Sequence, residues 1–530
     1  MALSQFSQAE MNQTERTGEI VQKRAFIPST IESKVLWFLT LILAIAGILL
    51  RIERALLDRS FRGDEAAMAS AIQNHSIFEL ITKSLGATIT APFSFLVIEK
   101  LVTGLFGPQD FFYRLIPLLA GCLSVIVMFF LARELLDDFG AAFAVGAFSL
   151  NWMLSFYSSD LKQYSTDVVM ALLIYLMAVR YIKDSSTKNI LWLAGVGLIG
   201  IFFSHPSIFI LSSVGPVLAY QAWSNRREFK KIILIGVLWV GVFLALYFLS
   251  YRLVEQYSYN VDYWNNLGAL MPVPPWKNPG WFVQRLSAFL TVDLNLTQLT
   301  FIEAILYLSG IAYFFLKKKW QWAFILPGSI LFTFLASGIA NYPFKDRLIL
   351  FLASGTLLVI GAGIDSLVFF LKSPSFLSHG LRWLLTAYLL VGPVTSTYGY
   401  ILQPRAFPLK DDIKPVMSYV EQHMEPNDEF VIYDQATVTY SYYSLFYDLN
   451  NSPTILLGDY RKKPLKYQEV IDSLPKNQRI WFIFSNVLYT LNNESDRTYM
   501  FDHLSSIGGH IIDQVGGNDT YSSGYLVIIK

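Results

Sequence analysis

The sequence has 530 residues, of which 54% are hydrophobic and only 15% are charged, and its mean hydropathy is +0.42. Soluble domains carry roughly 25% charged residues, so this composition excludes an ordinary soluble protein and predicts a membrane protein. The net charge of +1 does not suggest nucleic-acid binding, and the single cysteine, Cys122, excludes both a disulfide framework and a thiolate zinc site.

Eleven segments come close to the roughly 20 apolar residues that a helix needs to cross a bilayer. They lie at 35–51, 114–133, 139–157, 165–182, 190–204, 207–223, 232–251, 301–316, 323–340, 348–371 and 382–400. We therefore predict a mainly α polytopic membrane protein with about eleven transmembrane helices. The polar stretch 1–33 has no cleavable signal pattern and is expected to be a disordered cytoplasmic tail.

Lysine and arginine residues in the short loops indicate the orientation, because cytoplasmic loops carry an excess of both. One set of loops is consistently basic: Arg133; Lys183 and Lys188; Arg226, Arg227, Lys230 and Lys231; Lys317, Lys318 and Lys319; and Lys372. Together with the basic N-terminal tail, this set predicts a cytoplasmic N-terminus. An odd number of spans then places the C-terminus outside the cell.

The membrane domain is expected to cover residues 34–400, with two long outer loops at 52–113 and 252–300. Within the first loop, the amphipathic stretch 92–106 is short and contains charges, so we expect it to lie along the membrane surface. The second loop is rich in proline and tryptophan and is expected to be irregular.

The composition of residues 401–530 is that of a soluble protein. Apolar runs in this region predict strands, and stretches such as 413–423 have a helical pattern. The predicted strands lie near 429–433, 453–457, 479–484 and 525–529. Strands that alternate with helices indicate a small extracytoplasmic α/β domain.

Ionisable residues gather just beyond the outer ends of the predicted helices, where the positive-inside trend would not place the cations among them. They are Asp64, Glu65, Asp110, Arg114, Asp160, Lys162, His205, Arg252, Lys345, Asp346 and Arg347. Each is either an ordinary interface anchor or ion pair, or part of a set that converges on one anionic substrate. A phosphate on a long lipid fits the second alternative, because arginine and lysine bind phosphate and the tail can lie between helices.

The sequence Arg62-Gly63-Asp64-Glu65 follows the first predicted helix closely. A carboxylate pair just outside the membrane can supply a general base and a partner that positions it or shares a metal. The same pair can instead begin a helix over 65–74, with Asp64 as its N-cap. No H-E-x-x-H, P-loop, G-x-S-x-G or CxxC pattern occurs, so common hydrolase, nucleotide and redox chemistries have no support.

Several stretches, in this order along the chain, resemble one known family. An outer Asp64-Glu65, an amphipathic stretch that ends in Leu105-Phe106-Gly107, and Tyr113-Arg114-Leu115 at the start of the second helix form the pattern of GT-C membrane glycosyltransferases. The similarity is greatest to family 39, which includes protein O-mannosyltransferases and Rgt-like bacterial enzymes. The loops at 157–167 and 342–348 resemble segments of the same branch, and the resemblance covers roughly residues 35–400.

The resemblance implies an inverting transferase that moves a hexose or pentose from a polyprenyl-phosphate carrier to an acceptor hydroxyl of a glycan, lipid or protein. Asp64 would be the catalytic base, and Glu65 would orient Asp64 or the acceptor. The residues that would contact phosphate or sugar are Arg114, Asp160, Lys162, Tyr164, Lys345 and Arg347. Whether a divalent metal joins the carboxylates stays open.

The sequence departs from the family pattern in ways that concern the site. Ala91-Pro92-Phe93 stands where His-Pro-Pro or Lys-Pro-Pro is common, and Lys162 stands where the branch has an arginine, so a bidentate fork is lost. The luminal repeat domain of eukaryotic mannosyltransferases and the Trp-Trp-Asp signature of oligosaccharyltransferases are absent. A bacterial enzyme of the cell (inner) membrane, active in cell-envelope glycan biosynthesis, is therefore expected.

Two other classes compete with this prediction. A polytopic transporter or flippase of lipid-linked sugars is the main alternative, although the predicted helices have few charges at mid-span and the chain has no evident duplicated half. A noncatalytic anchor that displays residues 401–530 would leave the clustered outer charges without a reason.

Overall fold

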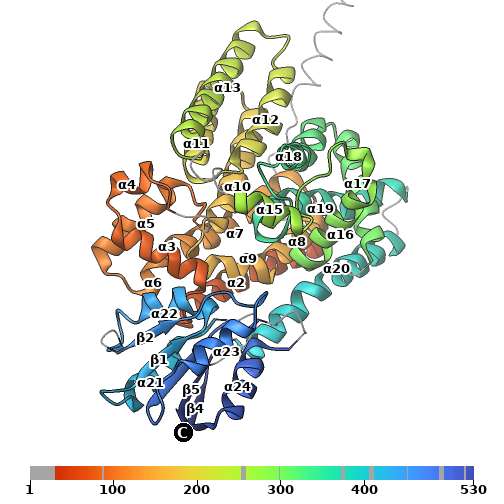
Figure 1. Cartoon of the computed structure of the whole chain (residues 1–530). Coiled ribbons are helices and arrows are strands. Elements are labelled where there is room, and N and C mark those ends of the chain that lie inside the picture. The colour runs from red at the N-terminus through yellow and green to blue at the C-terminus, as the bar shows by residue number, and fades with distance from the viewer. Residues whose placement is uncertain are drawn as a thin grey trace, which may run out of the picture.

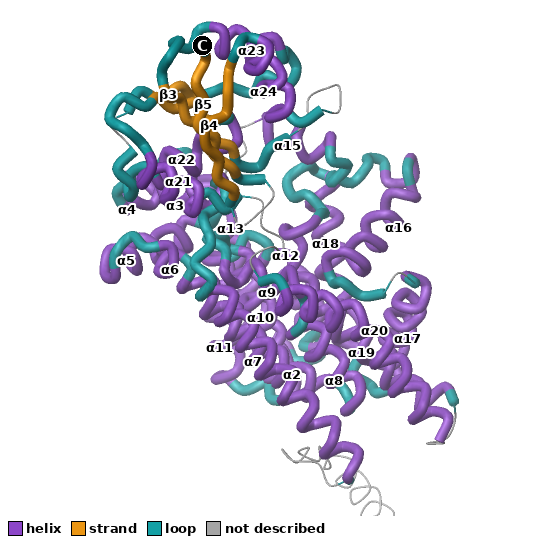
Figure 2. Tube along the Cα trace, turned by 90° about the horizontal axis from the view of Figure 1, so that it is seen from below, coloured by secondary structure: helices purple, strands orange, loops and turns teal. Residues whose placement is uncertain are grey.

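The computed structural model describes residues 30–85, 89–251, 258–297, 299–371, 376–404, 411–449, 452–488, 494–517 and 521–530. Within these ranges helices predominate, and one five-stranded sheet stands at one end of the helical body (Figure 1, Figure 2). The predicted fold class, a mainly α membrane protein with a small C-terminal α/β region, is confirmed. The predicted tail 1–33 lies almost entirely outside the described residues, which begin at Thr30.

Each of the eleven predicted membrane segments coincides with helical structure. The elements are α2 (Ile31–Ala55), α7 (Leu115–Leu135), α8 (Asp138–Ser149) with α9 (Trp152–Phe156) and η1 (Tyr157–Ser159), α10 (Tyr164–Lys183), α11 (Thr187–Phe203), α12 (Ser207–Gln221), α13 (Arg226–Leu246) with η2 (Tyr247–Tyr251), α17 (Thr300–Leu316), α18 (Trp320–Gly338), η5 (Asp346–Leu352) with α19 (Ala353–Phe370), and α20 (Phe376–Leu402). Among the described residues, six helices are long and apolar enough to cross a membrane, judged by their length and hydropathy alone. The bent pair of α8 and α9 would make a seventh. Helices α11, α12 and α17 are apolar but shorter.

The segment predicted as one helix over 139–157 is broken, and its two parts meet at an angle of 51°. Asn151 lies at the break. Its side-chain oxygen accepts from the Leu154 amide at 2.8 Å, which caps the start of α9, and its side-chain nitrogen donates to the Asp293 carbonyl at 2.9 Å. The bend directs the chain after α9 toward the end of α2.

The outer loops contain more helix than we predicted. The first loop holds α3 (Gly63–Asn74), α4 (Ile77–Thr82), α5 (Phe93–Phe106) and α6 (Asp110–Tyr113). The prediction that 252–300 is irregular is wrong, because its described part contains α15 (Ser258–Asn266), η3 (Pro275–Lys277), α16 (Pro279–Ala288) and η4 (Phe289–Asp293). The start of α16 could have been predicted from neighbouring residues, because Asn278 caps the Trp281 amide and Pro279 occupies the first helical position.

The backbones of helices α17 and α19 are in direct contact at two glycines. A Cβ atom at Gly310 would lie 1.9 Å from the Val359 carbonyl oxygen, and one at Gly363 would lie 2.0 Å from the Leu306 carbonyl oxygen. Small residues allow such close approach between membrane helices.

We expect Gly310→Ala to destabilise the protein by about 1–3 kcal/mol, because the added methyl group forces the two helices apart. Gly236→Ala in α13 is the matched control, because nothing lies within 4 Å of a Cβ atom there. Thermal unfolding of both variants in detergent tests the expectation, and equal unfolding temperatures would contradict it.

The C-terminal sheet has the order β2-β1-β3-β5-β4, with β1 (Glu429–Ile432) parallel to β2 (Thr454–Leu456) and β3 (Arg479–Phe484). Strand β5 (Ser523–Ile529) is antiparallel to both β3 and β4 (Gly509–Gly516). The four predicted strands are confirmed. Strand β4 was not predicted, because it lies at the sheet edge with mostly exposed or half-buried side chains and so lacks an apolar run.

The helices of this region are α21 (Lys414–His423), η6 (Asp434–Ala436), α22 (Thr437–Tyr443), α23 (Leu465–Asp472) and α24 (Asp496–Ser506). Helix α22 packs against α3, so the sheet region contacts the first outer loop directly (Figure 1). The first outer loop and the C-terminal region therefore lie on the same side of the helical body.

Candidate active site

The carboxylate of Glu65 anchors the start of α3. Its Oε2 accepts from Arg59 Nη1 at 2.9 Å and from the Arg62 amide at 3.1 Å, and its Oε1 accepts from the Leu161 amide at 2.9 Å and from Arg114 Nη2 at 3.2 Å. The side chain is fully buried. Burial alone would raise the pKa of Glu65, but Arg114, Arg59 and Arg62 lower it well below its usual value. Glu65 is therefore held as an anion by groups from three segments.

A second buried carboxylate, Asp160, joins the loop between α9 and α10 to the loop after α2. Its two oxygens accept from Arg59 Nη2 and from Arg62 Nη2, each at 2.5 Å. The side chain of Arg59 thus bridges Asp160 and Glu65. The ion pairs of Asp160 are therefore with two arginines of the loop after α2.

Asp64 is the carboxylate of this group that reaches solvent, with 22% of its side chain exposed. Lys162 Nζ lies 3.6 Å from it, Arg62 Nη2 3.7 Å and Arg347 Nη2 3.8 Å. These distances exceed those of a hydrogen bond, so the cations surround Asp64 without a close contact. Burial would raise the pKa of Asp64, but Lys162, Arg62 and Arg347 together lower it far below the usual value of 3.8.

Aromatic rings line the same region. The rings of Tyr157 and Tyr164 meet edge to face at 5.0 Å. The guanidinium group of Arg347 lies 5.9 Å from the centre of the Tyr164 ring, and that of Arg62 lies 5.2 Å from the Phe156 ring. Planar cations are held well against such faces, so the rings restrict how far the arginines can turn.

Seven of the eight predicted site residues come together here: Asp64, Glu65, Arg114, Asp160, Lys162, Tyr164 and Arg347. Lys345 is placed differently. It pairs with Asp346 at 3.8 Å and lies near Asp293, a carboxyl from the second outer loop. Burial, reinforced by the charge of Asp346, raises the pKa of Asp293 to about 8.

Two central residues, Arg59 and Arg62, were not among the predicted site residues. Both contact Asp160 and Glu65, and Arg62 also faces Asp64. Their position could have revealed them, because the sequence predicts that this end of the first helix lies outside, where the positive-inside trend does not place arginines.

The cluster carries an excess of positive charge. Five cations (Arg59, Arg62, Arg114, Lys162 and Arg347) face three carboxylates (Asp64, Glu65 and Asp160), which leaves two positive charges at the usual ionisation states. Arginines and backbone amides occupy the oxygens of Glu65 and Asp160, and the remaining carboxylate, Asp64, faces three cations. This donor set does not fit a divalent metal. Elsewhere among the described residues no group of three or more His, Cys, Asp or Glu side chains could hold one.

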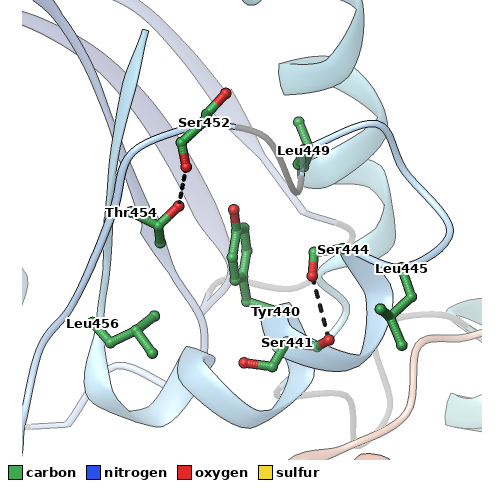
Figure 3. A pocket seen from close by; sticks show the side chains of 8 residues that line it. All are labelled: Tyr440, Ser441, Ser444, Leu445, Leu449, Ser452, Thr454 and Leu456. Atoms are coloured by element: carbon green, nitrogen blue, oxygen red, sulfur yellow. Dashed lines mark hydrogen bonds between the residues drawn. The ribbon is translucent and has the colours of Figure 1, made fainter.

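A separate pocket of about 380 Å³ lies on the C-terminal region, between α22 and β2 (Figure 3). Tyr440, Ser444 and Thr454 line it, together with leucines. Its lining has no charged side chain and consists of hydroxyl and leucine side chains.

Comparison with known proteins agrees with the resemblance. Residues 90–253 match the family model described as dolichyl-phosphate-mannose-protein mannosyltransferase. The matched segment contains Arg114, Asp160, Lys162 and Tyr164. The predicted similarity to membrane glycosyltransferases is thereby confirmed over this part of the chain. No curated protein sequence matches the chain.

Several solved structures have a similar course of the chain. ArnT from Cupriavidus metallidurans bound to undecaprenyl phosphate has a TM-score of 0.46 at 13% identity, over 92% of this chain and 97% of that one. Its apo form has a TM-score of 0.48 at 11% identity, over the same shares. The archaeal oligosaccharyltransferase AglB from Archaeoglobus fulgidus has a TM-score of 0.44 at 11% identity, over 78% and 64%. Because these scores lie below 0.5, none decides the function of this chain.

Proposed function

We propose that the protein transfers a sugar, a hexose or a pentose, from a polyprenyl-phosphate carrier to an acceptor hydroxyl, with inversion at the anomeric carbon. The observation that carries the proposal is the cluster around Asp64, in which one partly exposed carboxylate stands among three cations from three segments. A carboxylate can accept a proton there, and the surplus of cations can bind a phosphate.

In the proposed reaction, Asp64 and the cations around it have different roles. Asp64 takes the proton of the acceptor hydroxyl as that oxygen forms a bond to the anomeric carbon. The bond from that carbon to the phosphate oxygen breaks on the opposite face, and its electron pair leaves with the phosphate. Lys162, Arg62 and Arg347 stabilise the negative charge that develops on the leaving phosphate. A phosphate is a good leaving group, so no second carboxylic acid is needed.

The same cations explain how Asp64 can act as a base although its pKa is low. Without substrate they face Asp64. A bound phosphate would share them, and its negative charge would offset part of their effect, so the pKa of Asp64 would be lowered less. The basicity of Asp64 would therefore rise when the donor is bound.

We further propose that this reaction takes place on the outer face of the cell membrane, with the N-terminus in the cytoplasm. The basic loops support this orientation. The C-terminal region contacts the loop that carries Asp64, so both lie on one side of the membrane. Division into a membrane domain (34–400) and a C-terminal domain (401–530) is part of the same proposal.

The experiment is a transfer assay with purified protein in detergent. Dolichyl or undecaprenyl phosphate that carries tritiated mannose, glucose, galactose or xylose serves as donor, and a detergent extract of membranes serves as acceptor. We expect label to move from the lipid to a new product with release of polyprenyl phosphate. A transporter or flippase of lipid-linked sugars would leave the label on the lipid, since detergent provides no second compartment.

A further inference from the structure

The loop that precedes Asp64 is held from two sides. On the membrane side, the arginine side chains of the cluster bond its backbone: Arg114 Nη1 donates to the Arg59 carbonyl at 2.8 Å and its Nη2 to the Ser60 carbonyl at 3.2 Å. On the opposite side, the partners come from the C-terminal region, more than 350 residues further along the chain.

Two consecutive amides of this loop donate to side chains of the C-terminal region. The Ser60 amide donates to Asp412 Oδ1 at 3.0 Å, and the Phe61 amide donates to the Tyr443 hydroxyl at 2.7 Å. The Ser60 hydroxyl donates to Asp412 Oδ1 at 2.7 Å and accepts from the Lys414 amide at 2.9 Å. Because a peptide amide with a side-chain partner has little freedom to rotate, the backbone is fixed three residues before Asp64.

Tyr443 joins the loop to Asp110. Its hydroxyl accepts from the Phe61 amide and donates to Asp110 Oδ2 at 2.5 Å, and Asp110 in turn pairs with Lys414 Nζ at 3.1 Å. The side chain is 3% exposed. The Phe61 ring packs between the rings of Tyr442 and Tyr113, at 5.4 and 5.7 Å. Water is thus kept from the hydrogen bonds on this side of the loop.

We infer that the C-terminal region is a positioning element for the catalytic loop, and that the Tyr443 hydroxyl sets the place of Asp64 through the Phe61 amide. This inference rests on the proposed function of Asp64. According to this inference, residues beyond 411 affect the reaction rate although they do not contact the substrate. A displacement of a reacting group by about 1 Å can cost about 100-fold in rate, so a small shift of this loop is sufficient.

The test compares Tyr443→Phe with Tyr442→Phe in the full-length protein, using the donor and acceptor fractions of the transfer assay. Both variants lose one hydroxyl from a buried ring of α22, but the described hydrogen bonds of the 58–62 loop include Tyr443 and not Tyr442. We expect kcat of Tyr443→Phe to fall about 10- to 100-fold. We expect its donor KM to change less than about threefold, because two of the three cations proposed to contact the phosphate, Lys162 and Arg347, lie on other segments. Tyr442→Phe should keep the kcat of the parent.

Ser60→Ala is the second variant, because it removes the hydroxyl that joins Asp412 to Lys414. It should show the same fall in kcat at an unchanged donor KM. If Tyr443→Phe does not fold, Ser60→Ala tests the inference in its place. The inference is wrong if folded Tyr443→Phe, or folded Ser60→Ala in its place, turns over at the parental rate, or if Tyr442→Phe loses as much. An active Asp64→Asn protein would instead overturn the proposed function, and the inference with it.

Discussion

Replacing Asp64 with Asn is expected to lower kcat by about 10²–10⁴-fold while the protein stays folded. Asn has the shape of Asp but cannot take a proton from the acceptor hydroxyl. Some stability should be lost, because the ionised carboxylate faces three cations, but the protein should stay folded, since Asp64 is partly exposed and these cations lie at 3.6–3.8 Å rather than in direct hydrogen bonds. The measurement is the rate of polyprenyl-phosphate release in the transfer assay, together with the thermal unfolding of the same sample.

The matched control for Asp64→Asn is Asp262→Asn, which removes an exposed carboxylate from α15 in the other outer loop. This variant should transfer sugar at the parental rate. If the Asp64→Asn protein were folded and equally active, Asp64 would not be the base and the proposed mechanism would fail. If both variants lost activity to the same degree, the loss would come from the change in charge and not from a catalytic role of Asp64.

Replacing Glu65 with Gln is expected to lower the free energy of unfolding by about 3–5 kcal/mol, because the change breaks a buried network of charges. The two oxygens of Glu65 accept from Arg59, from Arg114, and from the amides of Arg62 and Leu161. An amide keeps one acceptor oxygen, and its NH₂ group would face donors. Arg59 and Arg114 would then be buried with too little negative charge around them.

Thermal unfolding in detergent measures this effect, with Glu79→Gln as the control. Glu79 is a partly exposed carboxylate of α4 that pairs with Lys83 at 2.6 Å, and exposed pairs contribute about 0–1 kcal/mol. A Glu65→Gln protein as stable as the parent would show that this carboxylate is not the anchor of the loop. Asp64 and Glu65 are adjacent in the sequence, but their replacement should thus have different effects. Loss of the Asp64 carboxylate should remove activity, and loss of the Glu65 carboxylate should lower stability.

The positions of the helices could be predicted from the sequence, because a helix that crosses a bilayer needs a long apolar segment and hydropathy detects such segments. All eleven apolar segments are helical in the structure. Four of the five strands were also predictable, since β1 and β3 are buried and read as apolar runs. The edge strand β4 and the helices of the loop 252–300 were missed, because most of their described side chains are exposed or half-buried and they contain no long apolar run.

The sequence by itself determined that charged residues collect just beyond one set of helix ends, and it singled out Asp64 and most of its neighbours. It could not determine which charges pair. Only the tertiary structure decided that Glu65 turns inward to Arg59 and Arg114 while Asp64 faces solvent, and that Tyr443 holds the loop from far along the chain. The physical reason is that hydropathy is a property of each segment, whereas an ion pair depends on how segments distant in sequence are packed together.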